Sequence, residues 1–251
     1  MVLQLKTALG TAAWRKGLEA QQGAKFALSC VDVEPIHRAF APMAREQKFD
    51  VSEMAIVTAL QPDDVLVGHS GGGFDQTLAA DARPDLVKHI IYLAAGLPRE
   101  GRTYPEAMAM RDTEDGEFDG DVGEMLSYLN FDADGAMTFA DFDGAWRYFY
   151  HDCDEETARW AFSRLGPERF GDTTVTPVSV PTFWAAGLPR SFIRCLQDQS
   201  MPQWLADTVT RRLGVEQLTI DASHSPFLSR PKELAELLVH ATTTTPTGPL
   251  V

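Results

Sequence analysis

A serine between glycines is the feature of this sequence best suited to covalent chemistry. The run Gly68-His69-Ser70-Gly71-Gly72 fits the pattern G-x-S-x-G, which holds a serine on a tight strand-to-helix turn. Aliphatic residues at 65–67 predict the strand, and residues 74–82 predict the helix. We therefore predict that Ser70 is a nucleophile and that the amide of Gly71 stabilises an oxyanion. The alternative is a glycine-rich turn that matches the pattern by chance.

A serine hydroxyl is a weak nucleophile, so it needs a histidine to take its proton and a carboxylate to orient that histidine. Asp198 and His224 each follow a predicted strand, over 190–196 and 216–220 respectively, and lie in the loop after it. The carboxyl ends of parallel strands share one edge of a sheet. We predict that Asp198 is the acid and His224 the base at this edge.

Each of these two residues has an alternative interpretation. Asp198 is also placed to cap a helix, and Asp207 or Asp221 could replace it as the acid. His224 could be a solvated loop histidine. The position of Asp198 directly after a strand and before a turn proline favours it as the acid.

Composition limits the classes of partner. The chain has 251 residues, 44% of them hydrophobic and 23% charged, as expected of a globular protein with one large α/β domain. Its net charge of -14 disfavours nucleic acid and anionic membranes as partners. The three cysteines form no C-x-x-C pair, so we expect no disulfide framework, no metal site and no cofactor. We see no secretory signal or membrane-length apolar run and predict a cytoplasmic protein.

The order of strands and helices after residue 61 predicts a parallel βαβ arrangement. We expect an α/β fold with a mostly parallel sheet flanked by helices, formed by residues 62–240. Residues from about 100 to 175 lack strand patterning and predict a mainly helical cap over the site. Residues 241–251 are rich in threonine, proline and glycine and predict a flexible tail.

Aromatic side chains near these residues predict how a substrate is held. We expect His69, Trp146, Tyr150 and Phe227 to contact a small-molecule substrate in an acyl or aromatic pocket. The alternative for the aromatic residues of the cap is that they form the core of the cap itself. The run 132–135 has part of a calcium-loop pattern but lacks its later acidic ligands, so we do not assign a calcium site.

Residues 62–240 resemble the α/β-hydrolases, in particular the small esterase and hydroxynitrile-lyase-like branch. The resemblance is carried by the run Leu66-Val67-Gly68-His69-Ser70-Gly71-Gly72, by Tyr150-His151-Asp152-Cys153, by 190–202 and by 221–231. It implies a serine nucleophile at Ser70, an acid at Asp198 and a base at His224. Members of this branch usually have a His-Gly loop whose amide completes the oxyanion hole, and no His-Gly pair precedes Ser70 here.

The segment 1–61 resembles a different family. Leu3-Gln4-Leu5-Lys6-Thr7-Ala8-Leu9-Gly10 and the runs 33–43 and 49–55 are similar to the N-terminus of 4,5-dihydroxyphthalate decarboxylase. The usual first strands of the hydrolase sheet are thus expected to be atypical, with this segment packed on the sheet. Losing one oxyanion donor costs about two to three powers of ten in rate. A backbone amide from Leu9-Gly10-Thr11 could supply the missing donor.

The leading hypothesis is therefore an esterase that cleaves carboxylic esters through a Ser-His-Asp triad and an acyl-enzyme intermediate. A lactonase or lyase with the same triad is an alternative, as is an impaired hydrolase fold that acts as a binding module. A metal-dependent decarboxylase would rest on residues 1–61 alone. The sequence leaves a homodimer open and does not specify the ester.

Overall fold

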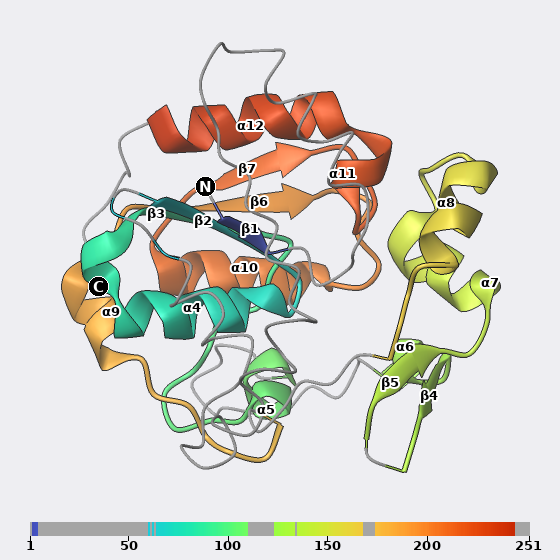
Figure 1. Cartoon of the computed structure of the whole chain (residues 1–251), viewed down its shortest axis with the longest axis horizontal. Coiled ribbons are helices and arrows are strands. Elements are labelled where there is room, and N and C mark those ends of the chain that lie inside the picture. The colour runs from blue at the N-terminus through green and yellow to red at the C-terminus, as the bar shows by residue number, and fades with distance from the viewer. Residues whose placement is uncertain are drawn as a thin grey trace.

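In the part of the chain that the computed structural model describes, five parallel strands form a sheet at the centre of the molecule (Figure 1). The structure describes residues 2–4, 60, 62, 64–109, 123–133, 135–167 and 174–243. The strand order is β1-β2-β3-β6-β7, and every neighbouring pair is parallel. The strands are β1 (Val2–Gln4), β2 (Asp64–His69), β3 (Val87–Leu93), β6 (Arg190–Cys195) and β7 (Gln217–Ile220).

The middle of the sheet is apolar because helices cover both of its faces. Ile90 and Ile91 on β3 are fully buried, as are Phe192 and Ile193 on β6. Consecutive buried residues of this kind are typical of parallel strands packed on both sides. The core therefore lies directly beneath the strand ends that carry the predicted site.

Helix α12 (Pro231–Thr243) covers one face of the sheet, and α4 (Gly72–Ala82) and α10 (Gln203–Leu213) cover the other (Figure 1). Helix α9 (Pro181–Ala186) packs on α4, and the 3-10 turn η1 (Pro84–Leu86) leads into β3. The short α11 (Pro226–Ser229) precedes α12. Gly214 ends α10 with φ 66°, a left-handed conformation that favours glycine. In the described ranges, no helix has the length and apolar character needed to cross a bilayer.

A separate group of small elements lies between β3 and β6 in the sequence and beside the carboxyl ends of β6 and β7 (Figure 1). We call residues 123–165 the insert. It contains α6 (Gly123–Leu126), the antiparallel strands β4 (Leu129–Phe131) and β5 (Met137–Phe139), α7 (Phe142–Ala145), the π-helix η2 (Trp146–Tyr150) and α8 (Glu155–Phe162). Helix α5 (Tyr104–Ala109) precedes it.

The elements of the sheet agree with the sequence predictions, whereas the insert corrects one of them. Strand β3 and helix α10 have the predicted bounds. The region from about 100 to 175 was expected to lack strands, but β4 and β5 form a hairpin there. Its turn uses Asp132 and Gly135, from the run with the partial calcium-loop pattern: Asp132 Oδ1 accepts the amide of Ala136 at 2.8 Å, and Gly135 has φ 78°. Three-residue strands are too short to give a clear alternating pattern.

Predictions at the two ends of the chain are only partly within the described residues. Among the described strands, β1 is the outermost, beside β2, where a strand from the N-terminal segment was expected. The rest of the segment 1–61, apart from Leu60, lies outside the described residues, so the decarboxylase-like packing stays a prediction. At the other end, α12 continues to Thr243, which lies inside the predicted flexible tail 241–251.

Candidate active site

Ser70 lies on a strained turn at the carboxyl end of β2. Its φ of 55° is unusual for a residue with a side chain and is typical of the sharp turn between a strand and a helix. Two hydrogen bonds fix this turn to the end of β3: the amide of Ser70 donates to Leu93 O at 3.2 Å, and the amide of Gly96 donates to Ser70 O at 3.1 Å. These bonds stabilise the left-handed backbone conformation of Ser70.

The glycines around Ser70 are required by close packing, as the pattern predicted. A Cβ on Gly68 would lie 2.7 Å from the carbonyl oxygen of Gly72. A Cβ on Gly73 would overlap the carbonyl oxygen of Gly96. Gly71 is the N-cap residue of α4, so its amide belongs to the positive end of that helix. This is the position at which an N–H group can stabilise negative charge.

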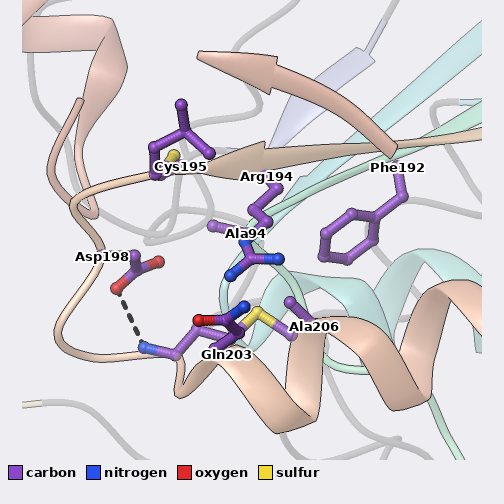
Figure 2. A pocket seen from close by; sticks show the side chains of 9 residues that line it. Ala94, Phe192, Arg194, Cys195, Asp198, Gln203 and Ala206 are labelled. Carbon is purple, nitrogen blue, oxygen red and sulfur yellow. Dashed lines mark hydrogen bonds between the residues drawn. The ribbon is translucent and has the colours of Figure 1, made fainter. Parts of the chain in front are cut away.

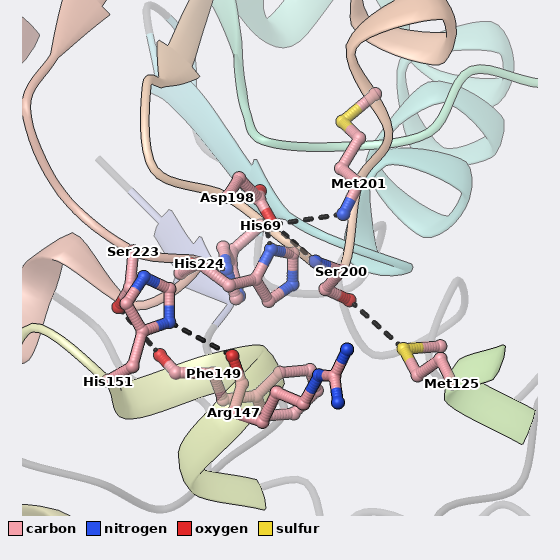
Figure 3. Close-up of polar contacts among 10 residues, drawn as sticks. All are labelled: His69, Met125, Arg147, Phe149, His151, Asp198, Ser200, Met201, Ser223 and His224. Carbon is pink, nitrogen blue, oxygen red and sulfur yellow. Dashed lines mark hydrogen bonds and ion pairs between the residues drawn. The ribbon is translucent and has the colours of Figure 1, made fainter. Parts of the chain in front are cut away.

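Asp198 and His224 form a buried acid–base pair (Figure 3). The Nδ1–H of His224 donates to Asp198 Oδ2 at 2.7 Å, and the two side chains are 1% and 4% exposed. The other oxygen, Oδ1, accepts the amides of Ser200 at 2.8 Å and Met201 at 2.9 Å. These bonds fix the orientation of the carboxylate, and the carboxylate in turn fixes the tautomer of His224.

The remaining nitrogen of His224 is the one that could accept a proton. Because Nδ1 carries the hydrogen given to Asp198, neutral His224 has a lone pair on Nε2. Nε2 is buried, and it has no hydrogen-bond partner in the part of the chain that the structure describes. Hydrogen bonds between a serine and its base are often long before substrate binds, so a base nitrogen without a partner is an expected state of a free enzyme.

The alternative acids lie elsewhere. Asp207 accepts from Arg194 at 3.2 Å and from Gln217 at 2.9 Å, in a polar cluster on α10, β6 and β7. Asp221 accepts from Gln197 at 2.8 Å. Of the three candidates, Asp198 is the one hydrogen-bonded to His224. The geometry therefore favours Asp198 over both alternatives.

The insert reaches the histidine loop through Phe149. The ring of Phe149 packs on the ring of His224, with centroids 4.9 Å apart and planes 30° apart. The hydroxyl of Ser223 donates to the carbonyl oxygen of Phe149 at 2.8 Å (Figure 3). On the acid loop, the hydroxyl of Ser200 lies 3.5 Å from the sulfur of Met125. The sequence gave no local signal for these contacts, because they join segments more than 70 residues apart.

The four predicted substrate contacts lie in different surroundings. Trp146 is half-buried and Tyr150 is buried, both in the small apolar core of the insert, which fits the alternative of a structural role there. Phe227 is buried in the main core. Its ring packs edge-on against His69, with centroids 5.1 Å apart. His69 points to the backbone of His224, where its Nε2 lies 2.8 Å from the carbonyl oxygen.

A small pocket lies beside the acid. It has a volume of about 80 Å³ and is bordered by Asp198, Arg194 and Gln203, together with apolar residues of β6 and α10 (Figure 2). Cys195 also borders it, and burial raises the pKa of that thiol far above its usual value. Burial likewise raises the pKa of Cys153 to about 12. Both thiols therefore stay protonated near neutral pH and do not compete with Ser70 as nucleophiles.

The predicted second oxyanion donor, Leu9-Gly10-Thr11, lies outside the described residues. Within them, the positioned groups are the Ser70 turn, the amide of Gly71 and the Asp198–His224 pair. They come from three strand ends along the same edge of the sheet: Ser70 follows β2, Asp198 follows β6 and His224 follows β7.

Comparison with known proteins decides the family. Residues 29–237 match the model of the Alpha/beta hydrolase family. The chain belongs to this family. The match starts inside the segment 1–61, so the hydrolase similarity begins earlier in the chain than the sequence analysis expected.

Relatives of this alpha/beta hydrolase include proteins named as an esterase and as a synthase. It is 24% identical to methylesterase 17 of Arabidopsis thaliana over 93% of this chain and 87% of that protein. It is 25% identical to norfluorocurarine synthase 2 of a Strychnos species, over 75% of this chain and 73% of the other. The crystal structure of polyneuridine aldehyde esterase superposes with a TM-score of 0.71 at 19% identity, covering 95% of this chain and 97% of that one. At this identity the last similarity supports the fold alone.

Proposed function

We propose that this alpha/beta hydrolase cleaves carboxylic esters of small molecules, with Ser70, His224 and Asp198 as nucleophile, base and acid. One observation carries the proposal. His224 donates its Nδ1–H to a buried carboxylate, and its Nε2 is buried without a hydrogen-bond partner in the described residues. Its backbone carbonyl oxygen lies 2.8 Å from Nε2 of His69, the residue before Ser70. An imidazole held in this tautomer is prepared to accept the proton of a serine hydroxyl.

The proposed reaction follows from these groups. Ser70 Oγ attacks the ester carbonyl carbon while its proton passes to Nε2 of His224, and the carbonyl electron pair moves onto oxygen. The amide of Gly71 stabilises that oxyanion, and Asp198 stabilises the imidazolium. When the intermediate collapses, the C–O bond to the alcohol breaks and the alcohol takes the proton from His224. Water then attacks the acyl-enzyme by the same steps and releases the acid.

The comparisons support the proposed reaction class in a limited way. One relative described above is named a methylesterase. Its identity of 24% leaves the substrate of this chain undetermined. The choice of ester hydrolysis therefore rests mainly on the acid–base pair and the serine turn.

Hydrolysis of p-nitrophenyl acetate tests the proposal. Removing the nucleophile of a serine hydrolase costs roughly six powers of ten in kcat, so Ser70→Ala should hydrolyse the ester no faster than background. Ser223→Ala is the matched control. It removes a hydroxyl from the loop of His224, and this hydroxyl donates to the carbonyl oxygen of Phe149. Equal rates for the wild type and Ser70→Ala would reject the proposal.

A lyase or related non-hydrolytic activity with the same residues is the second candidate. It is favoured by the relative named a synthase, and by the fact that an oriented base can remove a proton from carbon as well as from serine. A panel of esters, lactones and cyanohydrins separates the candidates. Release of cyanide from a cyanohydrin at a higher kcat/KM than acetate release would favour this second candidate. Ring opening of a lactone is hydrolysis of a cyclic ester and would specify the substrate of the first candidate.

A further inference from the structure

His69 connects the two loops on which the proposed reaction depends. It lies between Gly68 and Ser70, so its backbone is bonded directly to the nucleophile. Its side chain reaches a residue 155 positions later: Nε2 lies 2.8 Å from the carbonyl oxygen of His224. A carbonyl oxygen only accepts hydrogen bonds, so Nε2 of His69 carries the hydrogen and donates it.

The ring of His69 is also held by packing. Its centroid lies 4.6 Å from that of the His224 ring, and Phe227 meets it edge-on at 5.1 Å. A side chain bonded and packed in this way fixes the distance between the nucleophile turn and the histidine loop.

The charge state of His69 fits the same role. Burial, and then the charge of the neighbouring His224, lower the pKa of His69 to about 3. The ring therefore stays neutral while the imidazole of His224 becomes charged during the proposed reaction. A second positive charge 4.6 Å from the first would disfavour that step.

We propose that His69 is a positioning residue that holds His224 at the correct distance from Ser70 by donating its Nε2–H to the backbone carbonyl of His224. This inference rests on the proposed function. The direct substrate contact predicted for His69 from the sequence stays a prediction.

Three substitutions separate the hydrogen bond from the bulk of the ring. In His69→Gln, the side-chain amide nitrogen can reach the position of Nε2, whereas in His69→Asn it is too short. His69→Phe keeps an aromatic ring without a donor. A displacement of about 1 Å at a catalytic group can cost about 10²-fold in rate. We expect kcat for p-nitrophenyl acetate to fall about 10²-fold in the Asn and Phe variants, to fall less than about tenfold in the Gln variant, and KM to change little.

The control is another buried histidine, His89 on β3. Its Nε2 lies 2.9 Å from Ser191 Oγ, at the end of the sheet away from Ser70. His89→Gln and His89→Asn should leave kcat within about twofold of the wild type, even where they lower the melting temperature. A loss of kcat in the His69 variants without a matching loss in the His89 variants is not explained by general destabilisation.

Two results would overturn the inference. The first is a kcat within about twofold of the wild type in folded His69→Asn and His69→Phe; the second is an equal loss of kcat in the Gln, Asn and Phe variants. If the variants do not fold, ¹⁵N NMR of the wild-type imidazoles decides: neutral His69 with its hydrogen on Nε2 supports the inference, and hydrogen on Nδ1 contradicts it. Full activity in Ser70→Ala would instead reject the proposed function itself.

Discussion

Two regions of the molecule are stabilised in different ways: the insert, and the carboxyl edge of the sheet, where Ser70, Asp198 and His224 lie. We call the second region the edge. At the edge, Ser70, Asp198 and His224 are held by backbone hydrogen bonds and by a continuous buried core. The insert has a small core of its own, centred on Ala145, Tyr150, Ala158 and Ala161. The described contacts that join the two regions near the site include the Ser223–Phe149 bond and the Phe149–His224 ring packing. We infer that the edge determines the chemistry and that the insert mainly determines which substrates reach it.

Changing the acid should therefore have the largest effect. Asp198→Asn keeps the shape but can hold His224 in the wrong tautomer, which costs about 10⁴-fold in kcat in the serine protease that serves as the reference case for this substitution. We expect a loss of this size in kcat for p-nitrophenyl acetate, with a melting temperature near that of the wild type. Asp207→Asn is the matched control, because Asp207 bonds to Arg194 and Gln217 and not to His224. Similar losses in both variants would contradict the assignment of the acid.

Acid should lower the stability of the folded protein through His89, which is buried in the sheet. Burial lowers the pKa of His89 to about 4, so the unfolded chain binds a proton that the folded chain does not. The folded protein therefore keeps its full free energy of unfolding above pH 6.5, and this free energy decreases as the pH falls from 6.5 to about 4. The full effect is up to about 3 kcal/mol in the free energy of unfolding.

His89→Gln tests this pH effect. The free energy of unfolding, measured by urea denaturation, should decrease less steeply between pH 6.5 and 4 in the variant than in the wild type. Absolute stability is expected to fall at neutral pH, because the contact with Ser191 changes. Parallel pH curves for the two proteins would show that His89 does not contribute to acid sensitivity.

A change in the insert should have a smaller effect, and one that depends on the substrate. Phe149→Leu removes the ring that packs on His224 but keeps an apolar side chain. Such aromatic contacts contribute about 0.5–1.5 kcal/mol, so kcat/KM should fall by roughly tenfold or less. We expect the ratio of kcat/KM for aromatic and aliphatic esters to change.

Phe162→Leu is the control for that variant, since Phe162 packs on Phe142 in the same small core. It should affect the stability of the insert without altering the preference between esters. If both variants change the preference equally, Phe149 has no special relation to the site. If Phe149→Leu lowers activity as much as Asp198→Asn, the division between edge and insert is wrong.

The sequence predicted the edge better than the insert for physical reasons. β3 is a long apolar run, and Gly68 and Gly73 meet close packing that only glycine permits, so both features have local signatures. Asp198 was predictable from its place after a strand. The hairpin β4–β5 was missed because its strands have three residues each. The contacts of Phe149 and His69 with the His224 loop depend on tertiary packing, which local patterns do not encode.

Covalent labelling tests the role of Ser70 most directly. Folded wild-type protein is treated with a fluorophosphonate, digested, and analysed by mass spectrometry for the modified residue. An activated serine at the Ser70 turn predicts a single adduct on Ser70, which is absent in Ser70→Ala and forms much more slowly in Asp198→Asn. A folded wild-type protein that forms no adduct, or an adduct on another residue that persists in Ser70→Ala, would contradict it.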